Sequence, residues 1–482
     1  MAEFDKLPSY MRMELEFAQI CQQIGQNGIQ LDIQSCFGLI SQLELELEDI
    51  SKQLAPKIPP VVKIKEKILV KIYKKDGSPT KKMTDAIGSG DPYKIEGNGE
   101  AAILRVWSTT TSVPNLNNSE HLRDLLLKQG WQPLNQISSW NLQMEWGPFG
   151  RKVKSTRLDP KHNKKCYIRT TPKLPKEEWE LDYLDRIHES EDFRLISKYQ
   201  KRKHRLGVLK GFVKNIRADG RIKMGINSCS CNSMRVTHHI VANLPRVETY
   251  FGKDIRGVMT TPQGKVLVGC DMSGLELRIL AHYINDPTFT DSIINGDIHT
   301  YLYENLFKDL VKSRSSSKNL TYAFLYGGGL VKLGTMCDNV GKQGDLAKLG
   351  KEVKKRFLTR IPNLGNLYKD LEKQFTETGG IIGIDGRFIP CRYKHVLLNT
   401  LCQSGGAITS KYWTCLASRK LSESDSIVIY YHDENQVETL DESACIVQKI
   451  LIDSIGLAGK YLKLNIPLTG EAKIGKTWAD TH

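Results

Sequence analysis

The sequence predicts a protein that combines α-helices with buried β-strands. Apolar residues recur at intervals of three and four in several segments, which is the periodicity of helices with one buried face. Two short runs of β-branched and other apolar residues, 265–271 and 427–434, instead indicate buried strands, and acidic residues close both runs. Of the 482 residues, 40% are hydrophobic, so the chain can bury one or more cores of ordinary domain size.

Two long helices are predicted at the start of the chain. The apolar positions of the first are Met13, Phe17, Ile20 and Ile24. Those of the second, after a glycine-containing break at 25–28, are Leu39, Leu43, Leu47, Ile50 and Leu54. Pro56, Pro59 and Pro60 end this helical unit.

The segment at about 57–113 is predicted to be an inserted basic module. Apolar residues and lysines roughly alternate over 61–73 before an Asp76-Gly77 turn, a pattern typical of a β-hairpin. Residues 87–118 are rich in glycine, serine, threonine and asparagine, which favours a flexible stretch.

The net charge of the chain indicates which kind of partner it can bind. Lysines and arginines number 69 against 54 acidic residues, which gives a net charge of +15. Basic residues concentrate in 57–82, in 151–173, which we expect to be loop, and in 198–205, which follows a helical pattern. One such run is usually a solvated face, but three runs on a basic chain favour contact with phosphates.

Other classes of protein are disfavoured. The sequence contains no apolar run of the roughly 18 to 20 residues needed to cross a bilayer, and its start lacks the layout of a secretory signal. The eleven cysteines are irregularly spaced, and Cys229 and Cys231 lack the spacing of a zinc knuckle. We therefore expect a cytoplasmic protein with reduced thiols and no membrane partner.

Asp271 and Asp433 each lie at the end of a predicted buried strand. A carboxylate in such a place is costly unless a cation or a cap compensates it. Helix capping would suffice for Asp271, because 275–282 has a helical pattern, but Asp433 lies between two strands. If the two strands are neighbours, the pair offers oxygen ligands for magnesium, as two-metal phosphoryl transfer requires.

A helix between these acids has the chemistry of a phosphate-binding face. Arg314, Lys318, Tyr322 and Tyr326 recur every four residues, so a helix places them on one side. Two like charges at this spacing repel each other, which suggests that an anion such as a triphosphate binds between them. A surface helix with basic and aromatic residues on opposite faces would not have this spacing.

Together these motifs resemble those of family A (DNA polymerase I-like) DNA polymerases, most of all the replicative enzymes of short-tailed bacteriophages. The resemblance covers nearly the whole chain. Its motifs are 271–278 with 297–300, the helix from Arg314 to Gly327, His432-Asp433-Glu434, 399–403, 235–238 with 243–245, and 478–482.

The resemblance implies template-directed addition of deoxynucleotides to a primer on DNA. Two Mg²⁺ ions, replaceable by Mn²⁺, would be held by Asp271, Asp433 and the Met272 carbonyl. The remaining implied roles fall into two groups. The incoming nucleotide would be contacted by Arg314, Lys318, His299, Glu276, Tyr322 and Tyr326, with Lys318 also protonating the leaving pyrophosphate and Glu276 excluding a 2′-hydroxyl. The primer-template would be contacted by Arg235, Asn399, Gln403 and His432.

The implied fold is the α+β right hand with an antiparallel palm sheet. The resemblance assigns 1–207 to the thumb with the inserted module, 208–300 and 400–482 to the palm, and 301–399 to the fingers. It places no 3′–5′ exonuclease domain ahead of the thumb, and it suggests a processivity factor or other replisome protein as a partner of the module. Three residues depart from the family pattern: Met234, Ala323 and Tyr431.

Three alternatives remain at this point. A catalytically silent DNA-binding scaffold is disfavoured because all the catalytic positions are filled. A single-subunit RNA polymerase is disfavoured by Glu276 and by the spacing from Arg314 to Tyr326. A zinc hydrolase built on His432, His238 and His239 is weaker still, because these histidines lack ligand spacing on a helix.

Overall fold

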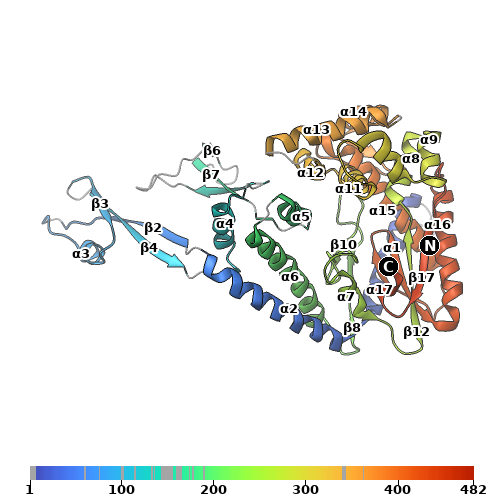
Figure 1. Cartoon of the computed structure of the whole chain (residues 1–482), viewed down its shortest axis with the longest axis horizontal. Helices are drawn as coiled ribbons and strands as arrows, with labels where there is room; N and C mark the ends of the chain where they lie inside the picture. The colour runs from blue at the N-terminus through green and yellow to red at the C-terminus, as the bar shows by residue number, and fades with distance from the viewer. Residues whose placement is uncertain are drawn as a thin grey trace. The chain divides into compact units, whose positions relative to one another are not determined.

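The chain forms two compact units, Met1–Glu46 with Lys201–His482, and Leu47–Gln200. The computed structural model (Figure 1) describes residues 7–58, 61–74, 76–98, 102–112, 116–131, 134, 136–142, 156–158, 165–172, 174–175, 178–187, 190–338, 343–361 and 363–482. Within these residues no helix is long and apolar enough to cross a bilayer. All cysteines whose side chains are described are free thiols.

A four-stranded antiparallel sheet organises the unit that contains both termini. Its strand order is β15-β16-β12-β17, with bounds Ser426–Tyr431, Glu434–Leu440, Lys265–Met272 and Gly470–Gly475. The apolar runs predicted to be strands therefore form β12 and β15, and the buried core of the unit includes both. In the register of β12 and β16, Asp271 lies opposite Glu434.

Helices cover this sheet. The helix α16 (Ala444–Tyr461) packs on β12, β16 and β17, and α1 (Ser9–Asn27) packs on β15 and on α15 (Leu397–Ser418). Figure 1 shows α16 beside β17. The short helix α17 (Trp478–Thr481) lies over Gly269. A Cβ at Gly269 would come within 2.6 Å of the Cβ of Thr481, so glycine permits this close approach.

A helical group follows β12 along the chain. Its helices are α8 (Leu275–Ile284), α9 (Pro287–Ile294), α10 (Ile298–Leu302), α11 (Arg314–Leu325), α12 (Leu330–Thr335), α13 (Gln343–Arg360) and α14 (Leu364–Thr378). The strands β13 (Gly380–Ile382) and β14 (Phe388–Pro390) then form a hairpin. Phe324 of α11 stacks on Phe357 of α13 with ring centroids 4.0 Å apart, which fixes the buried side of α11.

Smaller elements complete this unit. β1 (Ile29–Leu31) pairs with β8 (Arg221–Ile222) and β11 (Met259–Thr260), and β9 (Gly225–Asn227) pairs with β10 (Thr237–His239). The helix α7 (Gly252–Gly257) lies against α17. Two helices, α2 (Ile33–Leu54) and α6 (Glu191–Lys214), extend from one unit into the other. The helices predicted at the start of the chain and over 198–205 are thus confirmed.

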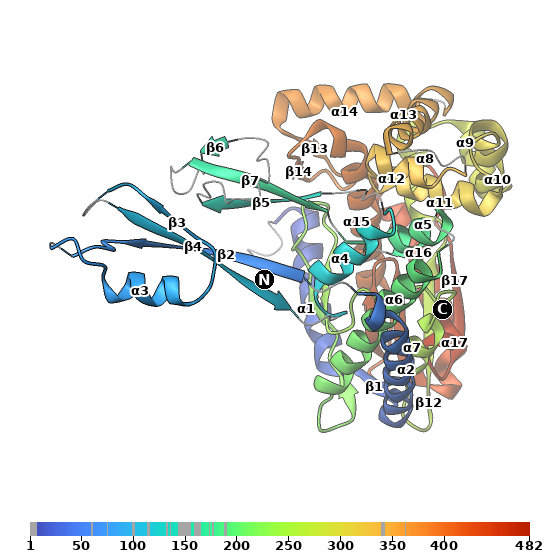
Figure 2. The same cartoon turned by 60° about the vertical axis from the view of Figure 1, so that its left-hand side comes forward.

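The unit 47–200 contains two three-stranded sheets. Figure 2 shows β2 (Val61–Val70), β4 (Ile103–Ser112) and β3 (Tyr93–Glu96) side by side, with α3 (Lys81–Gly88) next to them. The second sheet has the order β5-β7-β6, with bounds Gln136–Leu142, Lys165–Pro172 and Thr156–Leu158. The helices α4 (Ser119–Lys128) and α5 (Glu178–Ile187) complete the unit.

Two sequence predictions were wrong in this unit. The predicted hairpin around Asp76-Gly77 is limited to one bridge between Tyr73 and Pro79, because β2 pairs along its whole length with the distant β4. Residues 165–172, expected to be loop, form β7, which pairs with β5 and β6. Much of the rest of 151–173 lies outside the described residues.

A buried charge network ties α1 to α15. The Nζ of Lys411 has no solvent exposure and donates to Glu14 Oε2 at 2.9 Å and to the Ser228 carbonyl at 2.8 Å. Arg387 also donates to Glu14 and pairs with Asp385. Burial alone would raise the pKa of Glu14, but Lys411 and Arg387 together lower it below its ordinary value.

We predict that Glu14→Gln destabilises the protein by about 3 kcal/mol, because it leaves the buried Lys411 without its carboxylate. Because the pKa of Glu14 is lowered in the folded state, this stabilisation is complete at neutral pH. It is lost as the pH falls below the pKa of glutamate in the unfolded chain and through the lower pKa of Glu14 in the folded protein. Denaturant unfolding at pH 7 measures the effect. Glu16→Gln is the matched control on α1, because Glu16 pairs with the exposed Arg419. Equal unfolding midpoints for the two variants would contradict the prediction.

Candidate active site

The two predicted acids lie at the same edge of the sheet. Asp271 is near the end of β12, and Asp433 is in the turn between β15 and β16, next to Glu434, which is opposite Asp271 in the β12–β16 register. The backbone N–H of Met272 donates to the backbone carbonyl of Asp433 at 3.0 Å. The structure therefore brings together two residues that are 162 positions apart in the sequence.

This edge has the electrostatics of a cation site. Asp271 is exposed and Asp433 is half-buried, and partial loss of water around their carboxyls raises the pKa of both. Neighbouring acids raise these pKa values further: mainly Glu434 for Asp271, and Asp271 for Asp433. In the described part of the chain, no cationic side chain forms a hydrogen bond or ion pair with either carboxylate. A divalent cation would supply the missing positive charge.

The candidate metal ligands at this edge are two carboxylates. Across the described residues, no group of three or more acidic, histidine or cysteine side chains could hold a metal ion. Two carboxylates with backbone, water and substrate oxygens suit Mg²⁺, which retains waters and binds substrate phosphates. The residues present thus fit the implied metal.

The turn that carries Asp433 is held from several sides. His432 adopts φ = +63°, a conformation that few non-glycine residues take, and its carbonyl accepts from Ser410 Oγ at 2.9 Å. Tyr431, one of the departures from the family pattern, stacks on His238 at 4.9 Å, and its hydroxyl accepts from the Leu244 N–H. The larger aromatic side chain therefore adds a contact between β15 and β10.

Glu434 is fixed by the C-terminal segment. Its Oε1 accepts from Trp478 Nε1 and Gln436 Nε2, and its Oε2 lies 3.0 Å from His482 Nδ1. Trp478 is fully buried. Sequence reasoning noted 478–482 as a motif but gave it no role, because the partner of Trp478 is far away in the chain. These contacts anchor the start of β16 immediately after Asp433.

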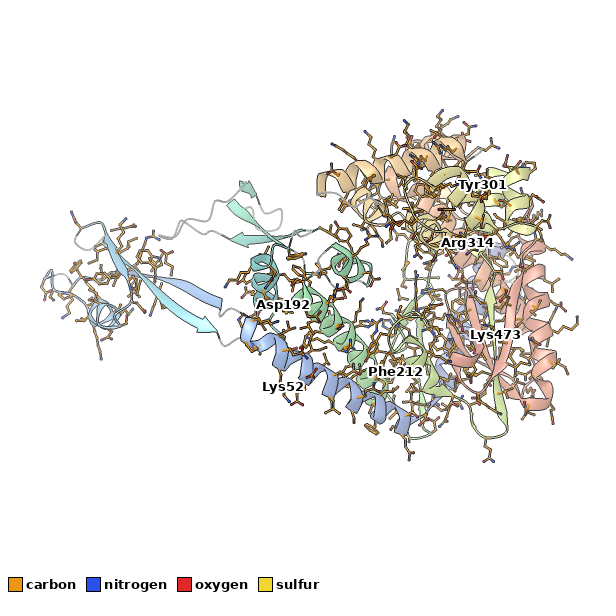
Figure 3. All side chains as sticks on the ribbon, viewed as in Figure 1. Lys52, Asp192, Phe212, Tyr301, Arg314 and Lys473 are labelled. Carbon is orange, nitrogen blue, oxygen red and sulfur yellow. The ribbon has the colours of Figure 1, made fainter. Side chains whose placement is uncertain are left out.

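The helix predicted between the two acids is α11, which begins at Arg314. Arg314, Lys318 and Tyr326 are exposed and Tyr322 is half-buried, whereas Leu320 and Phe324 are buried. Figure 3 labels Arg314 at the start of this helix. Its guanidinium is held by two bonds to the carboxylate of Asp297, including Nη2 to Oδ1 at 2.9 Å. Sequence reasoning did not assign a role to Asp297.

His299 lies beside this face. Its ring centroid is 5.7 Å from that of Tyr322, and the residue is buried. Burial, followed by the charges of Lys318 and Arg314, lowers the pKa of His299 to about 4. The imidazole is therefore neutral at pH 7 and can act as a hydrogen-bond donor through one nitrogen.

Glu276 connects the sheet edge to α11. This residue of α8 is buried, and its Oε1 accepts from Arg235 Nη2 at 2.8 Å and from the Tyr326 hydroxyl at 2.9 Å. The Arg235 guanidinium also lies 5.3 Å from the ring centroid of Tyr326. A cleft is lined by Arg235, Glu276, His432 and Asp433, together with Val236, Leu275, Gly406, Ala407 and Tyr430.

The other predicted DNA contacts are placed on α15. Asn399 and Gln403 are half-buried one turn apart, and Asn399 Nδ2 donates to the Leu325 carbonyl at 2.8 Å. Gln403 is not among the residues that line the cleft. Met234, another departure, has φ = +59°, which explains why glycine is common there, and its sulfur accepts from Arg387 at 3.4 Å. The third departure, Ala323, is buried on α11.

Comparison with known proteins identifies the family. The model of DNA polymerase family A matches residues 157–480, which include Asp271, Asp433, Glu276 and the whole of α11. The chain belongs to DNA polymerase family A. The DNA-directed DNA polymerases of Enterobacteria phage T3 and Escherichia phage T7 are each 29% identical over 310 residues. Each match covers 57% of this chain and 43% of the phage protein.

A solved structure confirms the fold. The polymerase domain of Pol1 from M. smegmatis, solved with DNA primer-template and dNTP, superposes with a TM-score of 0.69 at 16% identity. The match covers 100% of this chain and 72% of that structure. The α+β right-hand class predicted from the sequence is therefore confirmed.

We predict that Asp433→Asn raises the melting temperature of the metal-free protein by a few degrees at pH 8. Because the pKa of Asp433 is raised in the folded state, the folded protein loses stability as the pH rises above the pKa of aspartate in the unfolded chain. The uncharged amide of asparagine removes this cost. Calorimetry with and without Mg²⁺ measures the effect. Mg²⁺ should stabilise the wild type more than the variant. A lower melting temperature for the metal-free variant would contradict the prediction.

Proposed function

We propose that this chain is a template-directed DNA-dependent DNA polymerase that adds dNTPs to a primer 3′ end. One observation carries the proposal: Glu276 is bonded both to Arg235, in the cleft that Asp433 also lines, and to Tyr326 at the end of α11. One connected site thus contains the candidate metal ligands, a carboxylate that can exclude a 2′-hydroxyl, and a cationic helix face. The activities named for the phage relatives support the same assignment.

The aspartates would bind the metal and the helix would bind the nucleotide. Asp271, Asp433 and the Met272 carbonyl would hold two Mg²⁺ ions, for which Mn²⁺ can substitute. When bound, these ions supply Lewis-acid stabilisation of the charge that develops on the reacting phosphate. Arg314, Lys318 and the neutral His299 would bind the triphosphate oxygens through their N–H groups. Lys318 is exposed on the same face and would donate a proton to the leaving pyrophosphate.

The sugar and the primer would be positioned by the residues around Glu276. The Glu276 carboxylate is held by two donors and so presents a fixed obstacle to a 2′-hydroxyl. Tyr322 would lie beside the 3′ side of the sugar, and Tyr326 would stack at the template end. Arg235, Asn399 and Gln403 would contact the minor-groove edge of the primer-template, where every correct pair presents acceptors at equivalent places. His432 would contact the primer terminus.

We propose the subdomain boundaries on the same basis. The thumb would comprise 1–207, the palm 208–300 and 400–482, and the fingers 301–399. The four-stranded sheet belongs to the proposed palm, and α11 to α14 belong to the proposed fingers.

The inserted module at about 57–113 would contact DNA or a processivity factor. Ile68 and Val70, two residues apart on β2, both expose apolar side chains on one face of its sheet, which supports a protein partner.

We predict that the purified protein extends a primed DNA template with dNTPs and Mg²⁺, and that Asp433→Ala reduces the rate by at least about a thousandfold. Single-turnover extension measures both rates. The wild type should prefer dNTPs to rNTPs, and Glu276→Ala should weaken that preference. A wild type without activity would favour the silent scaffold, and a preference for rNTPs would favour an RNA polymerase.

We predict that the module controls product length but not nucleotide addition. Because Val61 lies opposite Ser112 in the β2–β4 register, a short glycine-serine linker can replace 61–112 without moving the ends of the gap. Products made in the presence of a host-cell extract should become shorter, while addition of a single nucleotide stays unchanged. Ile68→Asp with Val70→Asp tests the exposed face without a deletion. Unchanged product lengths for both variants would contradict a role for the module.

A further inference from the structure

We propose that Asp297 is a positioning residue that orients Arg314 and His299 together for the triphosphate of the incoming nucleotide. The inference rests on the proposed polymerase function and adds a residue to its nucleotide site. Asp297 is the N-cap of α10, the helix on which His299 lies, and Arg314 opens α11. A single carboxylate therefore joins the starts of two helices that both contribute phosphate-binding groups.

Four hydrogen bonds converge on this carboxylate. Its Oδ1 accepts from Arg314 Nη2 at 2.9 Å and from the His299 backbone N–H at 3.0 Å. Its Oδ2 accepts from Arg314 Nε and, at 2.8 Å, from the Thr300 hydroxyl. The cap holds the first turn of α10, and so the backbone of His299, in place. The paired bonds fix the plane of the Arg314 guanidinium.

The arrangement leaves Arg314 able to bind an anion. A guanidinium has five N–H donors, and Asp297 uses donors on Nε and Nη2. The donors on Nη1 have no acceptor within the part of the chain that the structure describes. The long side chain of Arg314 is exposed, so without Asp297 it would lose rotamer freedom when it bound a phosphate. Holding it beforehand lowers that cost.

The negative charge of Asp297 has the opposite effect, because it repels a triphosphate. Arg314 and the capping bonds hold the pKa of Asp297 far below its ordinary value, so the carboxylate stays charged at neutral pH. Repulsion through solvent is screened, since both side chains are partly exposed, whereas the paired bonds act directly on the binding group. We therefore expect positioning to outweigh repulsion. The two effects predict opposite changes in nucleotide affinity when the charge is removed.

The test compares Asp297→Asn with Asp286→Asn. Asp286 is the N-cap of the neighbouring α9, where its Oδ1 accepts from the Phe289 N–H at 2.7 Å, and it has no ion pair in the described residues. Both changes remove one charge and keep a capping oxygen. We expect Asp297→Asn to raise the KM for dNTP about tenfold with a small change in kcat, and Asp286→Asn to leave both unchanged. The Kd of dNTP on a dideoxy-terminated primer should rise in parallel.

Further variants separate positioning from damage to the fold. Asp297→Glu keeps the charge and should recover part of the lost affinity. In an Arg314→Ala background, Asp297→Asn should have a smaller effect than in the wild type, because the group it orients is gone. A KM for Asp297→Asn equal to or below that of the wild type, or an Asp297→Glu variant as weak as Asp297→Asn, would overturn the inference. An inactive wild type would instead overturn the proposed function and the inference together.

Discussion

The candidate site depends on one constraint that costs stability, the approach of Asp271 and Asp433 at the edge of the sheet. Pairing of β12 with β16 places Asp271 opposite Glu434, and the bond from the Met272 N–H to the Asp433 carbonyl brings the two strand ends together. Like charges in a partly desolvated place repel each other, which raises both pKa values. The fold keeps this arrangement because the rest of the sheet and its helices stabilise it.

The supporting contacts surround the acids. Trp478 and His482 hold Glu434, Ser410 and Tyr431 hold the turn at His432, and Glu276 is held by Arg235 and Tyr326. Further from the site, the buried pair of Glu14 and Lys411 joins α1 to α15. A site that accumulates negative charge is therefore held in place by hydrogen bonds from several surrounding elements, as expected where function costs stability.

Local patterns in the sequence were enough to predict several of the elements that carry the candidate site residues, but not the contacts between them. Asp271 and Asp433 were identifiable because each closes a buried apolar run, and Arg314 to Tyr326 because helical spacing gathers them. The pairing of β2 with β4 was missed because Asp76-Gly77 is a local turn signal, whereas the partner strand lies some thirty residues further on. The partners of Trp478 and Asp297 depend on tertiary contacts that no local pattern specifies.

The metal site itself is most directly tested by a crystal structure of the protein with primer-template DNA, an incoming dNTP and Mn²⁺, in which anomalous scattering locates the ions. The account predicts two ions that both lie between the carboxylates of Asp271 and Asp433 and the nucleotide phosphates. Ions bound elsewhere, with the two aspartates too far apart to share them, would contradict it.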